Sequence, residues 1–297
     1  MRKAVIDVGS NSLLLLVAER VGCAWESVFE ASRITGLGEG VKSTGILGED
    51  PMTRSLHALW ELVDLAHKHG AQSVRSGATM AVRMASNAND FLTRAAAQGT
   101  PVEVISGDQE AELGFRSVAE DPRFSGADRL SIIDPGGQST ELVVADRVGD
   151  RWDIHFRRSF PVGTLGLQAP EVLGFREILD LTRQIDEIIG MAFRPNEHGT
   201  PVVLGATGTN LISIREKMAM WDPERVHGQT LDYEEVSKAA GWLGKLTNEE
   251  RAAVPGMEPG RERTIHLGAL ILERFLFALR AYEVKVSVRG WRWAWLG

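Results

Sequence analysis

Two stretches of the chain alternate apolar runs with polar, glycine-containing turns. The first is AVIDVGSNSLLLLV at residues 4–17, and the second is LSIIDPGGQSTELVV at residues 130–144. In each stretch a β-branched and aliphatic run ends at an aspartate, a glycine turn follows, and a second apolar run begins. The pattern predicts two strands joined by a tight loop at both places.

The two predicted hairpins share their residue spacing. The first has Asp7, Gly9, Asn11, Ser12 and Leu15, and the second has Asp134, Gly136, Gln138, Ser139 and Leu142. Each loop alone is equally well interpreted as a plain glycine turn, because Asp, Gly and Ser are common turn residues. The repetition instead favours two related half-molecules of the actin and sugar-kinase type, with one phosphate-binding hairpin each and a cleft between them.

Between and after these hairpins, strand patterns alternate with helical periods, which indicates an α/β protein. Helices are predicted at residues 51–70, with Leu56, Leu59, Trp60, Val63 and Ala66 at helical spacing, and later at 211–220 and 261–282. The polar segment 120–129 contains Pro122 and Gly126 and marks the best boundary. We therefore predict domains at 1–125 and 126–297, and leave open that the last segment packs back on the first.

Three further features carry candidate chemistry. Ser106 and Gln109 match a capping box, which places Glu110 in the first turn of a helix after a strand. Glu110 could face a ligand there or simply complement the helix dipole. Arg83 could clamp phosphate or be an ordinary surface arginine. The segment GATGTN at 205–210, with Gly205, Thr207 and Gly208, predicts a turn whose amides face an anion before a helix begins.

Composition narrows the classes of function. The chain has 297 residues, 43% of them hydrophobic, and a net charge of -7, which argues against a nucleic-acid-coating protein. The single cysteine, Cys23, excludes an internal disulfide framework, and we interpret it as a buried filler. No apolar run approaches the roughly 20 residues of a membrane span. We expect a cytoplasmic protein without nucleic-acid or membrane partners.

The C-terminal tail places Trp291, Trp293 and Trp295 at alternate positions. If the tail is extended, the three indoles share one face, which could stack bases. Packing on the protein itself or on a twin subunit is the more ordinary use of such a tail. A homodimer is the partner that this interpretation suggests.

Taken in order, these pieces resemble the exopolyphosphatase and guanosine pentaphosphate phosphohydrolase (Ppx/GppA) family. The resemblance rests on many segments together and runs from Arg2 to about Gly290. The segments are IDVGSNSLLLLV, TGLGEGVKSTGIL, ATMAVRMASNANDF, VEVISGDQEAELGF, IIDPGGQSTELVV, SFPVGTLGL, VVLGATGTN, ERTIHLGALIL and VSVRG.

The resemblance implies duplicated actin-like (ribonuclease H-like) domains, Mg²⁺, and release of terminal phosphate from inorganic polyphosphate or guanosine pentaphosphate. By motif position it implies phosphate binding by one group of residues and catalysis by Glu110 and Glu141, with either glutamate able to take the proton from water. It implies metal binding by Asp7, Asp134 and Glu141. The phosphate-binding group is Ser10, Asn11, Ser12, Arg83, Gly136, Gly137, Gln138 and Ser139, to which the turn at Gly205, Thr207 and Gly208 is added.

Two departures support an alternative. The family's usual Asp-Ile/Leu-Gly-Gly-Gly-Ser loop reads Asp134-Pro135-Gly136-Gly137-Gln138-Ser139 here. Pro135 lacks an amide donor, and Gln138 adds a side chain where glycine lets backbone meet phosphate. The second hypothesis is therefore a sensor that binds polyphosphate or guanosine polyphosphate with little or no turnover. A small-molecule kinase on the same fold is a third.

Overall fold

The computed structural model describes residues 1–22, 24–190 and 198–297, so Cys23 lies outside the described residues. The chain forms two compact units. Unit 1 comprises Met1–Leu113 with Trp291–Gly297, and unit 2 comprises Gly114–Gly290. The division falls inside helix α5 (Gly107–Ala119), whereas the polar segment chosen from the sequence holds only the 3-10 turn η1 (Pro122–Phe124). The amino-acid composition does not reveal the boundary between the units, because α5 continues across that boundary.

Unit 1 is built on a five-stranded sheet of order β3-β2-β1-β4-β5. The first three strands pair antiparallel, while β4 and β5 run parallel to β1. The strands are β1 (Arg2–Val8), β2 (Ser12–Val21), β3 (Ala24–Ile34), β4 (Val74–Ala78) and β5 (Glu103–Val104). The helices are α1 (Val41–Thr44), α2 (Glu49–Lys68), α3 (Met80–Met84) and α4 (Ala88–Ala97), followed by the start of α5 and, from the C-terminus, α12 (Trp291–Ala294).

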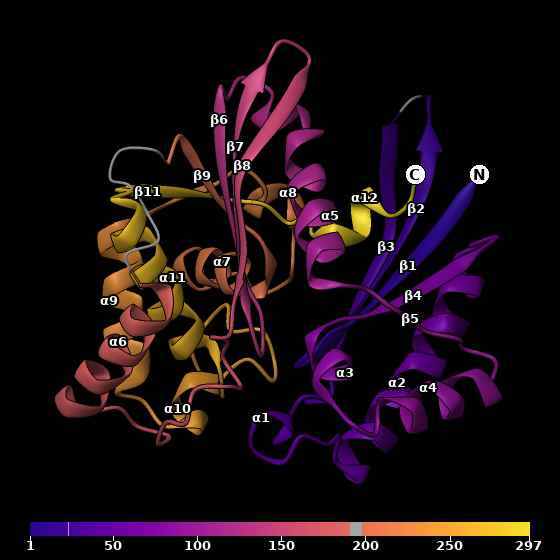
Figure 1. Cartoon of the computed structure of the whole chain (residues 1–297), viewed down its shortest axis with the longest axis horizontal. Helices are drawn as coiled ribbons and strands as arrows, with labels where there is room; N and C mark the ends of the chain where they lie inside the picture. Colours follow the sequence, from indigo (N-terminus) through magenta and orange to yellow (C-terminus); the bar gives the residue numbers. More distant parts are fainter. Residues whose placement is uncertain (23, 191–197) are drawn as a thin grey trace. The chain divides into compact units, whose positions relative to one another are not determined.

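Both faces of this sheet are covered, and Figure 1 shows α2 and α4 on one face and α12 on the other. Leu59 and Leu62 of α2 are fully buried in the core on the first face. The helix at 51–70 is confirmed, but Trp60 is 51% exposed and does not face the core. Its neighbour Leu59 occupies the buried stripe, and one residue further along a helix points about 100° away.

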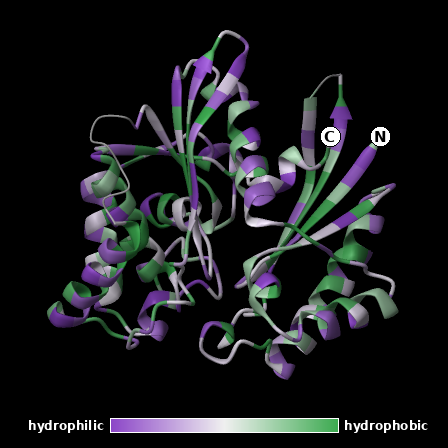
Figure 2. Cartoon of the chain, in the orientation of Figure 1, coloured by the Kyte–Doolittle hydropathy of each residue, from purple (hydrophilic) through white to green (hydrophobic). Residues whose placement is uncertain are grey.

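Unit 2 contains a six-stranded sheet of order β10-β11-β9-β6-β7-β8. The strands are β6 (Arg129–Pro135), β7 (Thr140–Val148), β8 (Arg151–Phe160), β9 (Thr200–Val203), β10 (Thr230–Asp232) and β11 (Glu283–Val286). The helices are α6 (Phe175–Ile189), α7 (Gly205–Arg215), α8 (Pro223–Val226), α9 (Tyr233–Gly244), α10 (Asn248–Ala252) and α11 (Ile265–Leu279). Figure 2 shows hydrophobic residues along α11, which is buried on most sides in the core of this unit.

The two units repeat one pattern of strands. In unit 1 the antiparallel series β1-β2-β3 is joined by β4 parallel to β1, and in unit 2 the series β6-β7-β8 is joined by β9 parallel to β6. The irregularity in the second pair also repeats, at Val17/Ala18 and at Val144/Ala145. Each bulge lies at the same spacing after its aspartate, Asp7 or Asp134. The predicted duplication is therefore confirmed at the level of strand order and local register.

Two expectations are corrected. The residues predicted as a turn at 205–210 already form the first turns of α7, which ends at Arg215 and not at residue 220. The tail begins with the helix α12 instead of an extended strand, and Trp291 and Trp295 contact one another edge to face. The three indoles therefore do not share the face that base stacking would need, and the homodimer stays a prediction without that support.

No helix of the described part is both long and apolar enough to span a bilayer.

Candidate active site

The hairpin loops of the two units have the same backbone geometry. The amide of Gly9 donates to the Ser12 carbonyl at 3.1 Å, and the amide of Gly136 donates to the Ser139 carbonyl at 2.8 Å. A Cβ at Gly9 would lie 2.8 Å from that serine oxygen, and one at Gly136 would lie 3.0 Å away. Only glycine fits such a close approach, which explains why both loops carry it at this position.

In unit 1 a second loop braces the first hairpin. The amides of Thr35 and Gly36 donate to the Asn11 carbonyl, both at 3.0 Å, and the Gly38 amide donates to the Ser10 carbonyl at 2.7 Å. These bonds occupy the carbonyls of the loop and fix its backbone. A phosphate-binding loop needs this rigidity, because its amides must already point at the anion.

Unit 2 braces its own hairpin in a comparable way. The amides of Thr164 and Leu165 donate to the carbonyls of Gly136 and Gly137 at 3.1 and 2.7 Å. A Cβ at Gly163 would come within 2.5 Å of the Gln138 amide nitrogen, so this backbone lies directly against the loop. Gln138 itself is 3% exposed, which means that its side chain is packed inside the protein. Pro135 is accommodated as the last residue of β6.

Asp7, the residue before the last of β1 in unit 1, has an unusual electrostatic environment. Its Oδ1 atom is sealed from solvent and has no hydrogen-bond partner among the described residues. Burial raises the pKa of Asp7 to about 7, while the positive charge of Arg292 and the nearby indole of Trp291 act in the opposite direction. A buried carboxylate oxygen without a donor suits a hard cation, which takes oxygen ligands.

Arg83 and Glu110 are brought together in unit 1. The Nη1 atom of Arg83 lies 2.8 Å from Oε2 of Glu110, and the side chains are only 17% and 11% exposed. Arg83 also donates to the Ile105 carbonyl at 2.6 Å. The predicted capping box is confirmed, with Ser106 and Gln109 bonded reciprocally at 3.1 and 3.2 Å, and it fixes the turn that carries Glu110. The candidate base and the candidate phosphate ligand therefore form one ion pair.

Unit 2 supplies the other two carboxylates. Asp134 and Glu141 are paired across β6 and β7, and Glu141 is 4% exposed. Oε1 of Glu141 accepts hydrogen bonds from the hydroxyls of Ser139 and Ser159, both at 2.7 Å. Ser159 was missed in the sequence. Ser159 lies in β8 opposite Glu141 of β7, and it can be recognised as a partner of Glu141 only from this strand pairing.

The third candidate element, at the start of α7, is partly a packing feature. A Cβ at Gly205 would lie 3.0 Å from Oδ1 of Asp134, so the helix begins against that carboxylate. A Cβ at Gly208 would instead meet Val203 at 2.5 Å, and Thr207 is buried beside Gly268. Gly205 thus adjoins the second hairpin, whereas Gly208 lets α7 pack closely on the sheet.

The predicted residues are divided between the units. Unit 1 holds Asp7, Ser10, Asn11, Ser12, Arg83 and Glu110; unit 2 holds Asp134, Gly136, Gly137, Gln138, Ser139, Glu141, Gly205, Thr207 and Gly208. Among the described residues no three His, Cys, Asp or Glu side chains are grouped to hold a metal ion.

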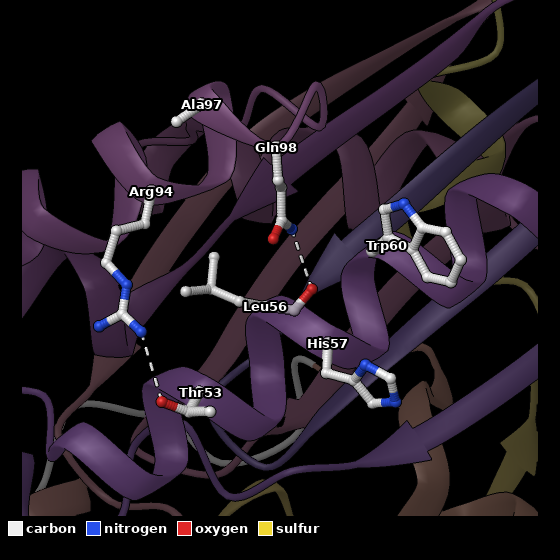
Figure 3. Close-up of a pocket in the computed structure, with 7 residues that line it drawn as sticks. All are labelled: Thr53, Leu56, His57, Trp60, Arg94, Ala97 and Gln98. Carbon is white, nitrogen blue, oxygen red and sulfur yellow. Dashed lines mark hydrogen bonds between the residues drawn. The ribbon is translucent and has the colours of Figure 1, made fainter.

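A hollow on unit 1 lies apart from these residues. It is formed by α2 and α4, and Figure 3 shows Arg94 bonded to Thr53 and Gln98 bonded to the Leu56 carbonyl along it. Trp60 and His57 complete its wall. None of the predicted site residues is among the described residues that line it.

Comparison with known proteins gives a consistent result. The model of the Ppx/GppA phosphatase family matches residues 16–293. Exopolyphosphatase 2 of Mycobacterium tuberculosis H37Rv is 31% identical over 299 residues, which cover 94% of this chain and 91% of the relative.

Two solved structures extend the comparison. The crystal structure of the Aquifex aeolicus member of the Ppx/GppA family has a TM-score of 0.79 at 29% identity, covering 100% of this chain and 96% of that one. An exopolyphosphatase from Cytophaga hutchinsonii has a TM-score of 0.86 at 22% identity, with the same coverage, and shows the shared fold.

Proposed function

Because the chain belongs to the Ppx/GppA phosphatase family, we propose that it is a Mg²⁺-dependent hydrolase that releases terminal phosphate from inorganic polyphosphate. The observation that supports it most is the repeated hairpin, which supplies each unit with a braced glycine loop directly after an aspartate. Guanosine pentaphosphate is a second substrate to test, since its terminal phosphoanhydride is the same chemical group.

In this proposal the loops bind phosphate through amides and hydroxyls. Ser10, Asn11 and Ser12 act from unit 1, and the loop from Gly136 to Ser139 acts from unit 2. Asp7, Asp134 and Glu141 are the carboxylates that would hold Mg²⁺. Bound magnesium would neutralise phosphate oxygens, where charge is concentrated in phosphoryl transfer.

The Arg83–Glu110 ion pair suggests how the base is released. A phosphate group competes with Glu110 for the Arg83 guanidinium, because a guanidinium binds phosphate in a bidentate geometry. When Arg83 turns to the phosphate, Glu110 loses its cation and can accept a proton from water. Oxygen of that water then bonds to the terminal phosphorus, the bond from phosphorus to the bridging oxygen breaks, and the products are orthophosphate and a chain one unit shorter.

Glu141 has a different role in this scheme. Two serine hydroxyls donate to one of its oxygens at 2.7 Å. Held in one orientation by Ser139 and Ser159, Glu141 is suited to orient the water or the hydrated metal. We therefore assign proton transfer to Glu110 and positioning to Glu141.

The sensor is the second candidate, favoured by the packed Gln138 side chain where the family has glycine. Purified protein with Mg²⁺ and polyphosphate, then with guanosine pentaphosphate, separates the two by phosphate release. Replacing the base, Glu110→Gln, should lower release about 100-fold or more. Glu112→Gln is the matched control, because Glu112 is exposed on the same helix. Tight binding by the wild type without release would establish the sensor and refute the hydrolase.

A further inference from the structure

The C-terminal helix α12 is fixed on the sheet of unit 1. Trp291 is 3% and Arg292 is 7% exposed, and Trp291 packs in a cluster with Val5 and Leu16 that is separate from the core under α2. Beyond the helix, Lys3 donates to the Leu296 carbonyl at 2.8 Å, and the guanidinium of Arg75 stacks 3.8 Å above the ring of Trp295. The tail is thus held along its length, and its side chains have little freedom.

Gly77 shows where the indoles of Trp291 and Trp295 lie. In the parallel pairing of β1 with β4, Gly77 is the register partner of Asp7. A Cβ at Gly77 would come within 2.9 Å of the rings of both Trp291 and Trp295. The rings therefore rest on the strand pair at the level of Asp7, in space that only a glycine leaves open.

Asp7 and Trp291 carry complementary unsatisfied groups. Nε1 of Trp291 is a buried donor and Oδ1 of Asp7 is a buried acceptor; neither makes a hydrogen bond of standard geometry among the described residues, although the indole lies near enough to lower the pKa of Asp7. Leaving both unpaired is costly, so a small rotation that joins them would be favourable. Arg292 adds a positive charge that acts on Asp7, and its contact with Glu30 is long, at 3.5 Å.

We propose that α12 is a positioning element for Asp7, in which the Trp291 indole and the Arg292 guanidinium orient the carboxylate toward a metal-bound phosphate. This inference rests on the proposed function, since it takes Asp7 as a metal ligand. Trp291 and Arg292 act through Asp7 and are positioning residues. In this arrangement residues 291–292 support a carboxylate of β1, the first strand.

The test uses the full-length protein and four variants. Trp291→Phe keeps the ring and removes the indole N–H, while Arg292→Gln removes the charge and Arg292→Lys keeps it. Trp295→Phe is the matched control, because it removes an indole N–H from the residue that follows α12 and preserves a ring under Arg75. Thermal unfolding of every variant establishes that the fold is retained.

Two measurements decide the outcome. Mn²⁺ binding without substrate, followed by electron paramagnetic resonance, should weaken about tenfold or more in Arg292→Gln and several-fold in Trp291→Phe, as is usual for partners of metal ligands. kcat for polyphosphate should fall with them while KM changes less than about twofold, and Arg292→Lys should recover part of both. Trp295→Phe should match the wild type.

The possible failures differ. If the wild type neither binds Mn²⁺ nor releases phosphate, the proposed function itself is wrong. If the wild type does both, and Trp291→Phe and Arg292→Gln behave like Trp295→Phe, the positioning role of α12 is refuted. Should Arg292→Gln fail to fold, Trp291→Phe still decides, because its change in shape is small.

Discussion

His266 provides the sharpest test of the electrostatics inside unit 2. It is 2% exposed in α11, and its Nδ1 has no hydrogen-bond partner among the described residues. Burial lowers the pKa of His266 to about 4, and the positive charge of nearby Arg251 contributes in the same direction. The folded protein therefore keeps this ring neutral under conditions in which an exposed histidine is protonated.

The sign of the effect on stability follows from that difference. Below its unfolded pKa of about 6.5, the imidazole binds a proton in the unfolded chain but not in the folded one. Stability from this group is therefore complete above about pH 6.5 and is lost as the pH falls toward about 4. At about 1.4 kcal/mol per pH unit, the loss is about 2 kcal/mol at about pH 5 and about 3 kcal/mol at about pH 4.

The measurement must be a difference, because Asp7 contributes the opposite slope. Its pKa is raised to about 7, so the folded state binds a proton that the unfolded state releases, and stability from Asp7 grows as the pH falls through that range. We propose comparing the wild type with His266→Phe by urea unfolding at several pH values. Phenylalanine keeps a ring, cannot titrate, and forfeits no hydrogen bond at Nδ1.

The gap between the two proteins isolates the histidine. The free energy of unfolding of His266→Phe, taken relative to that of the wild type, should rise by about 2 kcal/mol as the pH falls from about 7 to about 5. Nuclear magnetic resonance of the wild-type ring should show that it does not titrate near pH 6.5. Parallel stability curves, or a ring that titrates like an exposed histidine, would refute the reasoning.

Three further predictions follow from single contacts. Arg251 is fully buried and donates to four backbone carbonyls, so Arg251→Met should lower the free energy of unfolding by about 3–5 kcal/mol in urea; a loss below about 1 kcal/mol would contradict this. Gly77→Ala should cost about 1–3 kcal/mol by thermal unfolding, because its Cβ would clash with Ile105 and would meet the rings of Trp291 and Trp295 at 2.9 Å; an unchanged midpoint would contradict this close packing. Ser159→Ala removes one of the two donors to Glu141 and should lower kcat about tenfold at unchanged stability, whereas wild-type kcat would rule that contact out.

The parts that the sequence predicts well are those determined by neighbouring residues. The hairpin loops follow from glycines whose missing side chains admit a serine carbonyl, and such a constraint is visible in five residues of sequence. The start of α5 follows from the reciprocal bonds of Ser106 and Gln109. In both cases the interaction that fixes the structure joins residues close together along the chain.

The parts that it does not predict depend on distant residues. Trp291, Trp293 and Trp295 fit a strand of period two, but the first and last also fit one turn of a helix, and five residues cannot separate the periods. Packing against Gly77, far away in the sequence, decides for the helix. Ser159 likewise becomes recognisable only when β8 is laid beside β7, since nothing local distinguishes it from other serines.

Comparison of the two hairpins shows how a duplicated scaffold acquires unequal chemistry. Asp7 is paired across its hairpin with Leu14, whereas Asp134 is paired at the same place with Glu141. Unit 2 therefore carries a second carboxylate directly opposite its aspartate, and there it is held by two serines. Unit 1 provides its second carboxylate from α5, as Glu110, next to an arginine that can release it. The repeat supplies phosphate binding twice, but the residues suited to move a proton lie outside the repeated turn, so the hairpin motif alone could not identify them.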